Sequence, residues 1–96
     1  MSIKILKLVN GDDVISNINE SKEFVLKNPA KIMIFPTEGG EMGMGMVPWC
    51  PYTDQKDFTI EKSHIMTMFD APEGIRNQYS QEFGSGLVTP PTDLIL

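Results

Sequence analysis

Two residues in this chain carry the side chains that most often serve as a nucleophile and its base. Cys50 is the single cysteine and His64 the single histidine, and a thiol beside an imidazole can attack a carbonyl. The pattern suggests no third residue that would orient the imidazole, and a proline stands on each side of the Trp49-Cys50 pair. We therefore expect no catalytic residue and no enzyme.

Two further groups could hold a metal ion. Met42, Met44 and Met46 alternate with glycine, and thioethers bind Cu(I), but no histidine or cysteine joins them locally, and a loop tip is the simpler interpretation. Asp12 and Asp13 could bind Mg²⁺, yet consecutive residues of a strand point to opposite faces, which favours a solvated turn. The sequence predicts no metal site and no cofactor.

Length and charge limit the classes of function. The 96 residues make one domain, and a chain this short gains stability by oligomerisation. The net charge of −5 weighs against duplex DNA or anionic lipid as the main partner, although a local basic patch can still bind single-stranded nucleic acid. One cysteine fits a reducing compartment, and neither a secretory signal nor a membrane span is evident, so we expect a cytoplasmic protein without a membrane partner.

The elements that must position these side chains are mostly strands. Residues 3–9 and 14–18 are β-rich, and Asn10-Gly11 between them predicts a type I′ hairpin. Residues 24–35 predict a third strand interrupted at Asn28-Pro29, and 57–69 divide into two apolar pieces. The total of about five short strands, with turns roughly every 8–12 residues, is typical of a small barrel or sandwich, and interrupted alternation favours a strongly bent, closed sheet.

One helix is expected after the strands. Asp70 and Glu73 have the spacing of a capping box, and Ile75, Tyr79 and Phe83 place one apolar face toward the sheet. We expect the barrel over residues 1–70, with a long inserted hairpin at about 36–55. We expect residues 71–96 to form the helix and an extended tail of the same domain.

The opening hairpin resembles the first motif of the Sm-like (LSm) family. The similarity lies in "LVNG" at 8–11, Ile18 and "EFV" at 23–25, while "EKSHIMTM" at 61–68 resembles the turn between the last two barrel strands. The resemblance implies a mainly β fold, a small strongly bent five-stranded barrel, here with a C-terminal helix. It also implies a homo-oligomeric ring, joined through edge strands, that binds single-stranded RNA around its pore without catalysis, as in RNA metabolism or chaperone function.

Carried over by position, the resemblance assigns RNA binding to five residues. Glu23 and Phe24 match the loop where a base stacks, Lys62 and Ser63 match the pore-lining turn, and His64 is adjacent to them. Two simpler interpretations stay open: Phe24 as a core residue, and residues 62–64 as an ordinary polar turn.

Departures from the family pattern leave a second function open. Ser16 replaces a glycine that lets the second strand curve, so the bend is expected to come from elsewhere. The alternative is an oligomeric scaffold or adaptor, similar to short phage proteins of the family, that binds protein partners through residues 36–55 and the C-terminal tail. Dispersed rather than clustered lysines at 22, 27, 31 and 62 would favour this alternative.

Overall fold

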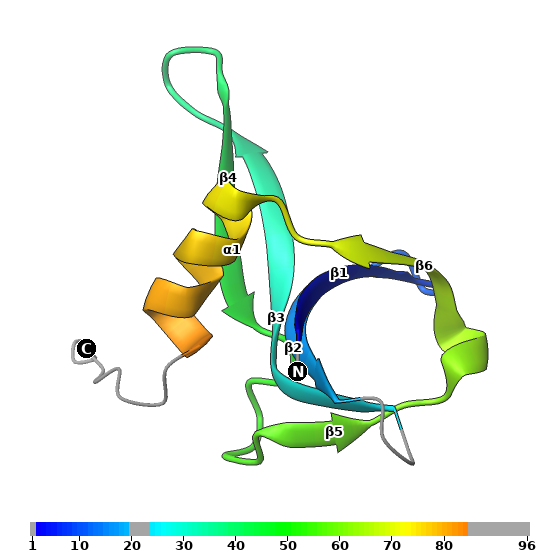
Figure 1. Cartoon of the computed structure of the whole chain (residues 1–96). Coiled ribbons are helices and arrows are strands. Elements are labelled where there is room, and N and C mark those ends of the chain that lie inside the picture. The colour runs from blue at the N-terminus through cyan, green and yellow to red at the C-terminus, as the bar shows by residue number, and fades with distance from the viewer. Residues whose placement is uncertain (1, 20–23, 85–96) are drawn as a thin grey trace.

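The chain folds as one bent antiparallel sheet with a short helix, in a computed structural model that describes residues 2–19 and 24–84 (Figure 1). Its strands are β1 (Ser2–Leu8), β2 (Asp13–Asn19), β3 (Val25–Pro36), β4 (Met42–Pro48), β5 (Asp57–Thr59) and β6 (Ile65–Asp70). A 3₁₀ turn, η1 (Lys62–His64), joins β5 to β6; helix α1 (Glu73–Tyr79) follows and continues as the π-helical turn η2 (Ser80–Gly84).

The strand order is β4-β3-β2-β1-β6, and β5 pairs with the first part of β3. The sheet curls so far that β5 and β6 approach each other from its two sides, and η1 spans the interval between them (Figure 1). No pairing joins β5 to β6 among the described residues, so the sheet is not closed. The expected fold class, a small bent Sm-like barrel, is confirmed, with six strands in place of five.

The bend has its origin in β2 and β3. The register between them shifts by one residue: Ile15 pairs with Ala30 and Asn17 with Lys27, so Asn28 and Pro29 of β3 lie opposite the single residue Ser16 and form a bulge. The buried hydroxyl of Ser16 donates to the Lys27 carbonyl oxygen at 2.9 Å. The bulge lies on β3 at Asn28-Pro29, which agrees with the expectations that the third strand is interrupted there and that the curvature arises away from Ser16. Within the bulge, Asn28 has φ 53°, a left-handed conformation that asparagine tolerates better than most residues.

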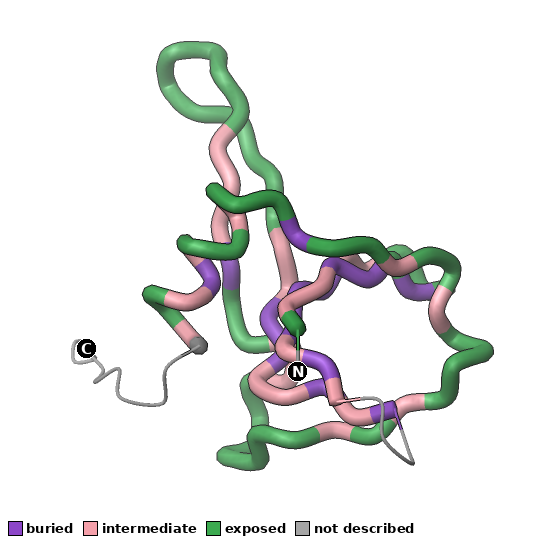
Figure 2. Tube along the Cα trace, viewed as in Figure 1, coloured by how far each residue is buried: buried purple, intermediate pink, exposed green. Residues whose placement is uncertain are grey.

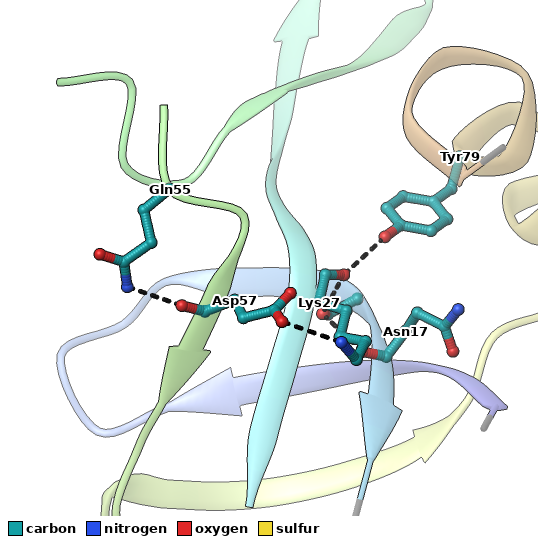
Figure 3. Close-up of polar contacts among 6 residues, drawn as sticks. Asn17, Lys27, Gln55, Asp57 and Tyr79 are labelled. Carbon is teal, nitrogen blue, oxygen red and sulfur yellow. Dashed lines mark hydrogen bonds and ion pairs between the residues drawn. The ribbon is translucent and has the colours of Figure 1, made fainter. Parts of the chain in front are cut away.

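Tyr79 of α1 fixes this bend from outside the barrel. Its hydroxyl donates to the carbonyl oxygens of Lys27 at 3.1 Å and Asn28 at 2.8 Å, as Figure 3 shows for Lys27. Burial raises the pKa of Tyr79 to about 12. The ammonium of Lys27 in turn lies 2.9 Å from the Asp57 carboxylate on β5, so one bend joins the sheet to α1 and to β5 (Figure 3).

Two hydrophobic clusters lie on opposite faces of the sheet. Inside the barrel, buried side chains of β1, β2, β3 and the residue before β3 pack with half-buried Trp49 and Ile60; they are Leu6, Leu8, Val14, Ile18, Phe24 and Leu26. On the outer face, α1 covers a second cluster of Ile5, Ile15, Ala30, Met46, Ala71 and Tyr79. Ile75 and Phe83 pack against this second cluster, which confirms the expected apolar face of the helix. Figure 2 shows the buried positions concentrated along β1 and β2.

Three local predictions are wrong. Only Gly11 of the Asn10-Gly11 pair has a positive φ, so the first hairpin does not have the type I′ turn. The N-cap of α1 is Pro72 without a side-chain hydrogen bond, because Asp70 lies at the end of β6 and pairs with Lys4 at 2.7 Å. The Met-Gly repeat is strand β4 rather than a loop tip, and its hairpin with β3 extends beyond the barrel (Figure 1).

Candidate functional site

The residues carried over from the second motif lie together on η1. Lys62, Ser63 and His64 are all exposed. Main-chain hydrogen bonds fix the turn on both sides: Val9 N–H donates to the His64 carbonyl at 2.9 Å, and Ile60 N–H donates to the Phe24 carbonyl at 3.1 Å. The turn therefore has a defined position between the two sides of the barrel, and it presents an ammonium, a hydroxyl and an imidazole to solvent.

Lys62 is placed by an aromatic ring. Its Nζ lies 5.9 Å from the centroid of Phe24, within the range of a cation–π contact, which contributes about 0.5–1 kcal/mol at exposed sites. No carboxylate in the described part of the chain lies within 4.0 Å of this ammonium. Lys62 is thus held at the barrel surface, and among the described residues its ammonium has no carboxylate partner.

The first-motif residues give a different result. Phe24 is only 5% exposed, packs inside the barrel and contacts Lys62. In this monomer it offers almost no surface for a base, and stacking on Phe24 stays a prediction. Glu23 lies outside the described residues.

The lysines elsewhere in the described chain are dispersed, and most are paired with carboxylates. Lys4 pairs with Asp70, Lys7 with Asp13, Lys27 with Asp57 and Lys31 with Asp12, at 2.7, 2.7, 2.9 and 3.5 Å. These pairs are at least partly exposed and individually weak, but each neutralises a cation that a phosphate would need. Lys22, the other member of the predicted set, lies outside the described residues.

Asp12, predicted from the sequence only as part of a solvated turn, is the centre of a group of polar contacts. Its carboxylate accepts hydrogen bonds from the Trp49 indole at 3.3 Å and the Asn10 amide at 3.2 Å, and it pairs with Lys31. Desolvation by itself would raise the pKa of Asp12, but these three partners outweigh it and lower the pKa. Trp49 is thereby anchored to the hairpin turn, a contact 37 residues apart in sequence that local patterns do not reveal.

The catalytic and metal-binding groupings find no support in the described residues. Cys50 and His64 line different hollows, and no described hydrogen bond joins their side chains. Met46 packs in the outer hydrophobic cluster, and Asp13 is paired with Lys7. Within residues 2–19 and 24–84, no group of three or more His, Cys, Asp or Glu side chains could hold a metal ion.

Two edge strands of the described sheet, β4 and β6, carry exposed apolar side chains. On β6 these are Met66, 64% exposed, and Phe69, 48% exposed. On β4, Met42 and Val47 are 64% and 41% exposed, and in the β3 part of the projecting hairpin Met33, Ile34 and Phe35 are also exposed. Strand edges with unpaired main-chain groups and apolar side chains are suited to pairing with another chain.

Comparison with known proteins agrees with this architecture. A family model, the Sm_like domain, matches residues 5–80, which include all six strands apart from the first residues of β1. No curated protein matches the sequence significantly. In the part of the chain that the structure describes, no helix has the length and apolar character needed to cross a membrane.

Proposed function

This chain belongs to the Sm-like family, and from that premise we propose that it forms a ring of identical subunits that binds single-stranded RNA without catalysing a reaction. The observation that carries the proposal is the exposed turn of Lys62, Ser63 and His64. In a ring this turn recurs once per subunit, and a circle of ammonium groups attracts phosphates far better than a single lysine does.

In this proposal Lys62 contacts phosphate, while Ser63 and His64 supply hydrogen bonds to phosphate or base edges. Phe24 supports the site by placing the Lys62 ammonium over its ring. The family resemblance also implies base stacking on Phe24 and a contact from Glu23. Stacking requires Phe24, which is 5% exposed, to become exposed in the assembled ring or on binding. The cytoplasm, where single-stranded RNA is available, is the expected location.

The test is fluorescence-polarisation binding of labelled oligo-U and oligo-A at low and moderate salt. We expect salt-sensitive binding that Lys62→Glu abolishes, because the substitution reverses the charge of the proposed phosphate contact. Lys56→Glu is the matched control, since Lys56 is also exposed, lies off the turn and undergoes the same change of charge. Equal loss in both variants, or no binding by the unmodified protein, would contradict the proposal.

A second function, an oligomeric scaffold or adaptor of phage type, is favoured by the charge distribution. Four described lysines are already paired with carboxylates, and each subunit has a net charge of −5. In this alternative the hairpin and loop of residues 36–55 and the C-terminal tail bind protein partners. If the protein forms an oligomer but binds neither oligo-U nor oligo-A at low salt, that result would support the scaffold or adaptor function.

A further inference from the structure

A hollow of about 230 Å³ lies next to the proposed phosphate-binding turn. Its lining combines an aromatic ring, aliphatic side chains and two polar groups, contributed by Leu8, Val9, Asn10, Trp49, Ile60 and His64. Pockets for drug-sized ligands occupy roughly 300–1,000 Å³, so this smaller hollow is suited to a single planar ring system. Neither the family resemblance nor the motifs considered above assign a role to Trp49 or to this hollow.

The walls of the hollow are held in place before any ligand arrives. The hydrogen bond from Val9 N–H to the His64 carbonyl, 2.9 Å, ties the first hairpin turn to η1. The indole nitrogen of Trp49 is anchored to Asp12, and its main-chain N–H donates to the Pro29 carbonyl at 3.0 Å. A preformed hollow loses less conformational freedom on binding than one that must be assembled.

The chemistry of the lining matches a nucleobase. An indole offers a π surface, and stacking on such a surface tolerates every base. Leu8 and Ile60 contribute apolar lining, while no hydrogen bond to a described residue occupies the His64 imidazole, which can meet the polar edge of a base. His64 also belongs to the same turn as Lys62, so one nucleotide could place its base in the hollow and its phosphate at the ammonium.

We propose that this hollow binds one base of single-stranded RNA, with Trp49 as the aromatic surface and His64 at the polar edge. The inference rests on the proposed function and deepens it, because it assigns base binding to Trp49 rather than to buried Phe24.

The experiment uses Trp49 as its own reporter, since it is the only tryptophan in the chain. The unmodified protein is titrated with a hexamer of A or U and with an abasic hexamer of the same backbone. We expect the base-containing hexamers to quench Trp49 emission and to bind about ten-fold more tightly than the abasic one, as stacking of a base implies. The abasic hexamer should bind through Lys62 and leave the emission unchanged.

Val9→Tyr then tests the hollow directly. Val9 is 58% exposed at the hollow, so a tyrosine can fill the space without disturbing the core. We expect this variant to bind the base-containing hexamers about ten-fold more weakly, through lost stacking, and the abasic hexamer as before. Ile34→Tyr, a similar change at a side chain that is 63% exposed on the projecting hairpin, should bind both like the unmodified protein.

The possible failures are distinguishable. If all hexamers bind equally and Trp49 emission does not respond, while Lys62→Glu abolishes binding, the proposed function stands and the base site is overturned. If no hexamer binds, the proposed RNA-binding function and the proposed base site are both contradicted. If Val9→Tyr does not fold, the base site is tested by comparing emission and affinity in the unmodified protein. The same comparison is then repeated with His64→Ala.

Discussion

At the scale of single residues, the carbonyl oxygen of Lys27 shows how the fold depends on distant side chains. It accepts hydrogen bonds from the hydroxyls of Ser16 and Tyr79, which reach it from β2 and from α1. Tyr79 also donates to the neighbouring carbonyl of Asn28 and is itself fully buried. A phenol in this position both fills the outer core and satisfies carbonyl groups at a bend where the regular ladder is broken.

We therefore predict that Tyr79→Phe destabilises the protein by about 1–2 kcal/mol, the typical cost of leaving a buried acceptor unsatisfied. The ring is retained, so packing against Phe83, 5.8 Å away between centroids, should persist. Urea unfolding followed by circular dichroism gives the free energy of unfolding.

The pH dependence provides the check on this prediction. The pKa of Tyr79 is raised to about 12, against about 10 in an unfolded chain. A raised folded-state pKa means that the contribution of this group is fully present below pH about 10 and is lost as the pH rises toward 12. The unmodified protein should therefore lose more stability than Tyr79→Phe between about pH 9 and pH 11. Equal losses would contradict the assignment.

At the scale of elements, the bend of β3 includes one residue with a left-handed backbone conformation. Asn28 has φ 53°, its N–H donates to the Lys56 carbonyl at 2.7 Å, and its side-chain amide donates to the Phe83 carbonyl at 3.1 Å. The asparagine thus fixes the strand, the loop before β5 and the end of the helical segment together.

We predict that Asn28→Ala costs more stability than Asn28→Gly. Both variants lose the amide bond to Phe83, but only alanine must also adopt a conformation that costs an L-residue about 1–2 kcal/mol. Unfolding of the two variants in urea separates the backbone contribution from the hydrogen bond. If alanine is tolerated as well as glycine, the left-handed conformation does not limit the fold.

The elements also show what local sequence could predict. The interruption at Asn28-Pro29, the division of residues 57–69 and the apolar helix face all depend on local residue types. The structure has each of them, the first as a bulge within the continuous strand β3. The N-terminus of α1 was mispredicted because the partner of Asp70 is distant: its carboxylate bonds to a lysine 66 residues away. The hydrogen bond of Ser16 to a carbonyl 11 residues away is likewise not apparent from local residue types.

The candidate site likewise has one part that local sequence predicts and one part that it does not. Residues 62–64 could be located because the family motif is local. The hollow beside them needs Val9, Trp49 and Ile60 from three separate segments, and no sequence pattern joins these segments before the barrel curls. Burial of Phe24 is likewise a consequence of the curl, which turns its side chain into the interior.

At the scale of the whole molecule, the open edges of the sheet bear on assembly. β4 and β6 lie at opposite ends of the strand order, and each carries exposed apolar side chains. Pairing of β6 in one subunit with β4 in the next joins two different surfaces, and such a contact closes into a ring when the rotation fits. Pairing of like edges would instead stop at a dimer.

Charge at either edge should interrupt this pairing. We predict that Phe69→Lys on β6 and Val47→Lys on β4 each yield monomers, because a lysine at a strand edge opposes sheet extension and both side chains are exposed in the monomer. Sedimentation velocity measures the state of each variant. Tyr52→Lys is the control, since Tyr52 is 93% exposed and lies outside the strands.

Mixing the two edge variants tests the head-to-tail arrangement itself. The Phe69→Lys chain keeps an unmodified β4 edge, and the Val47→Lys chain keeps an unmodified β6 edge. One intact contact can then form, while the other would bring together two modified edges, so the mixture should sediment as a one-to-one dimer that cannot close. Contacts between like edges predict a different result: each variant alone would keep the dimer formed by its unmodified edge. Monomers in the mixture, or a full oligomer from either variant alone, would show that assembly does not proceed through β4 and β6.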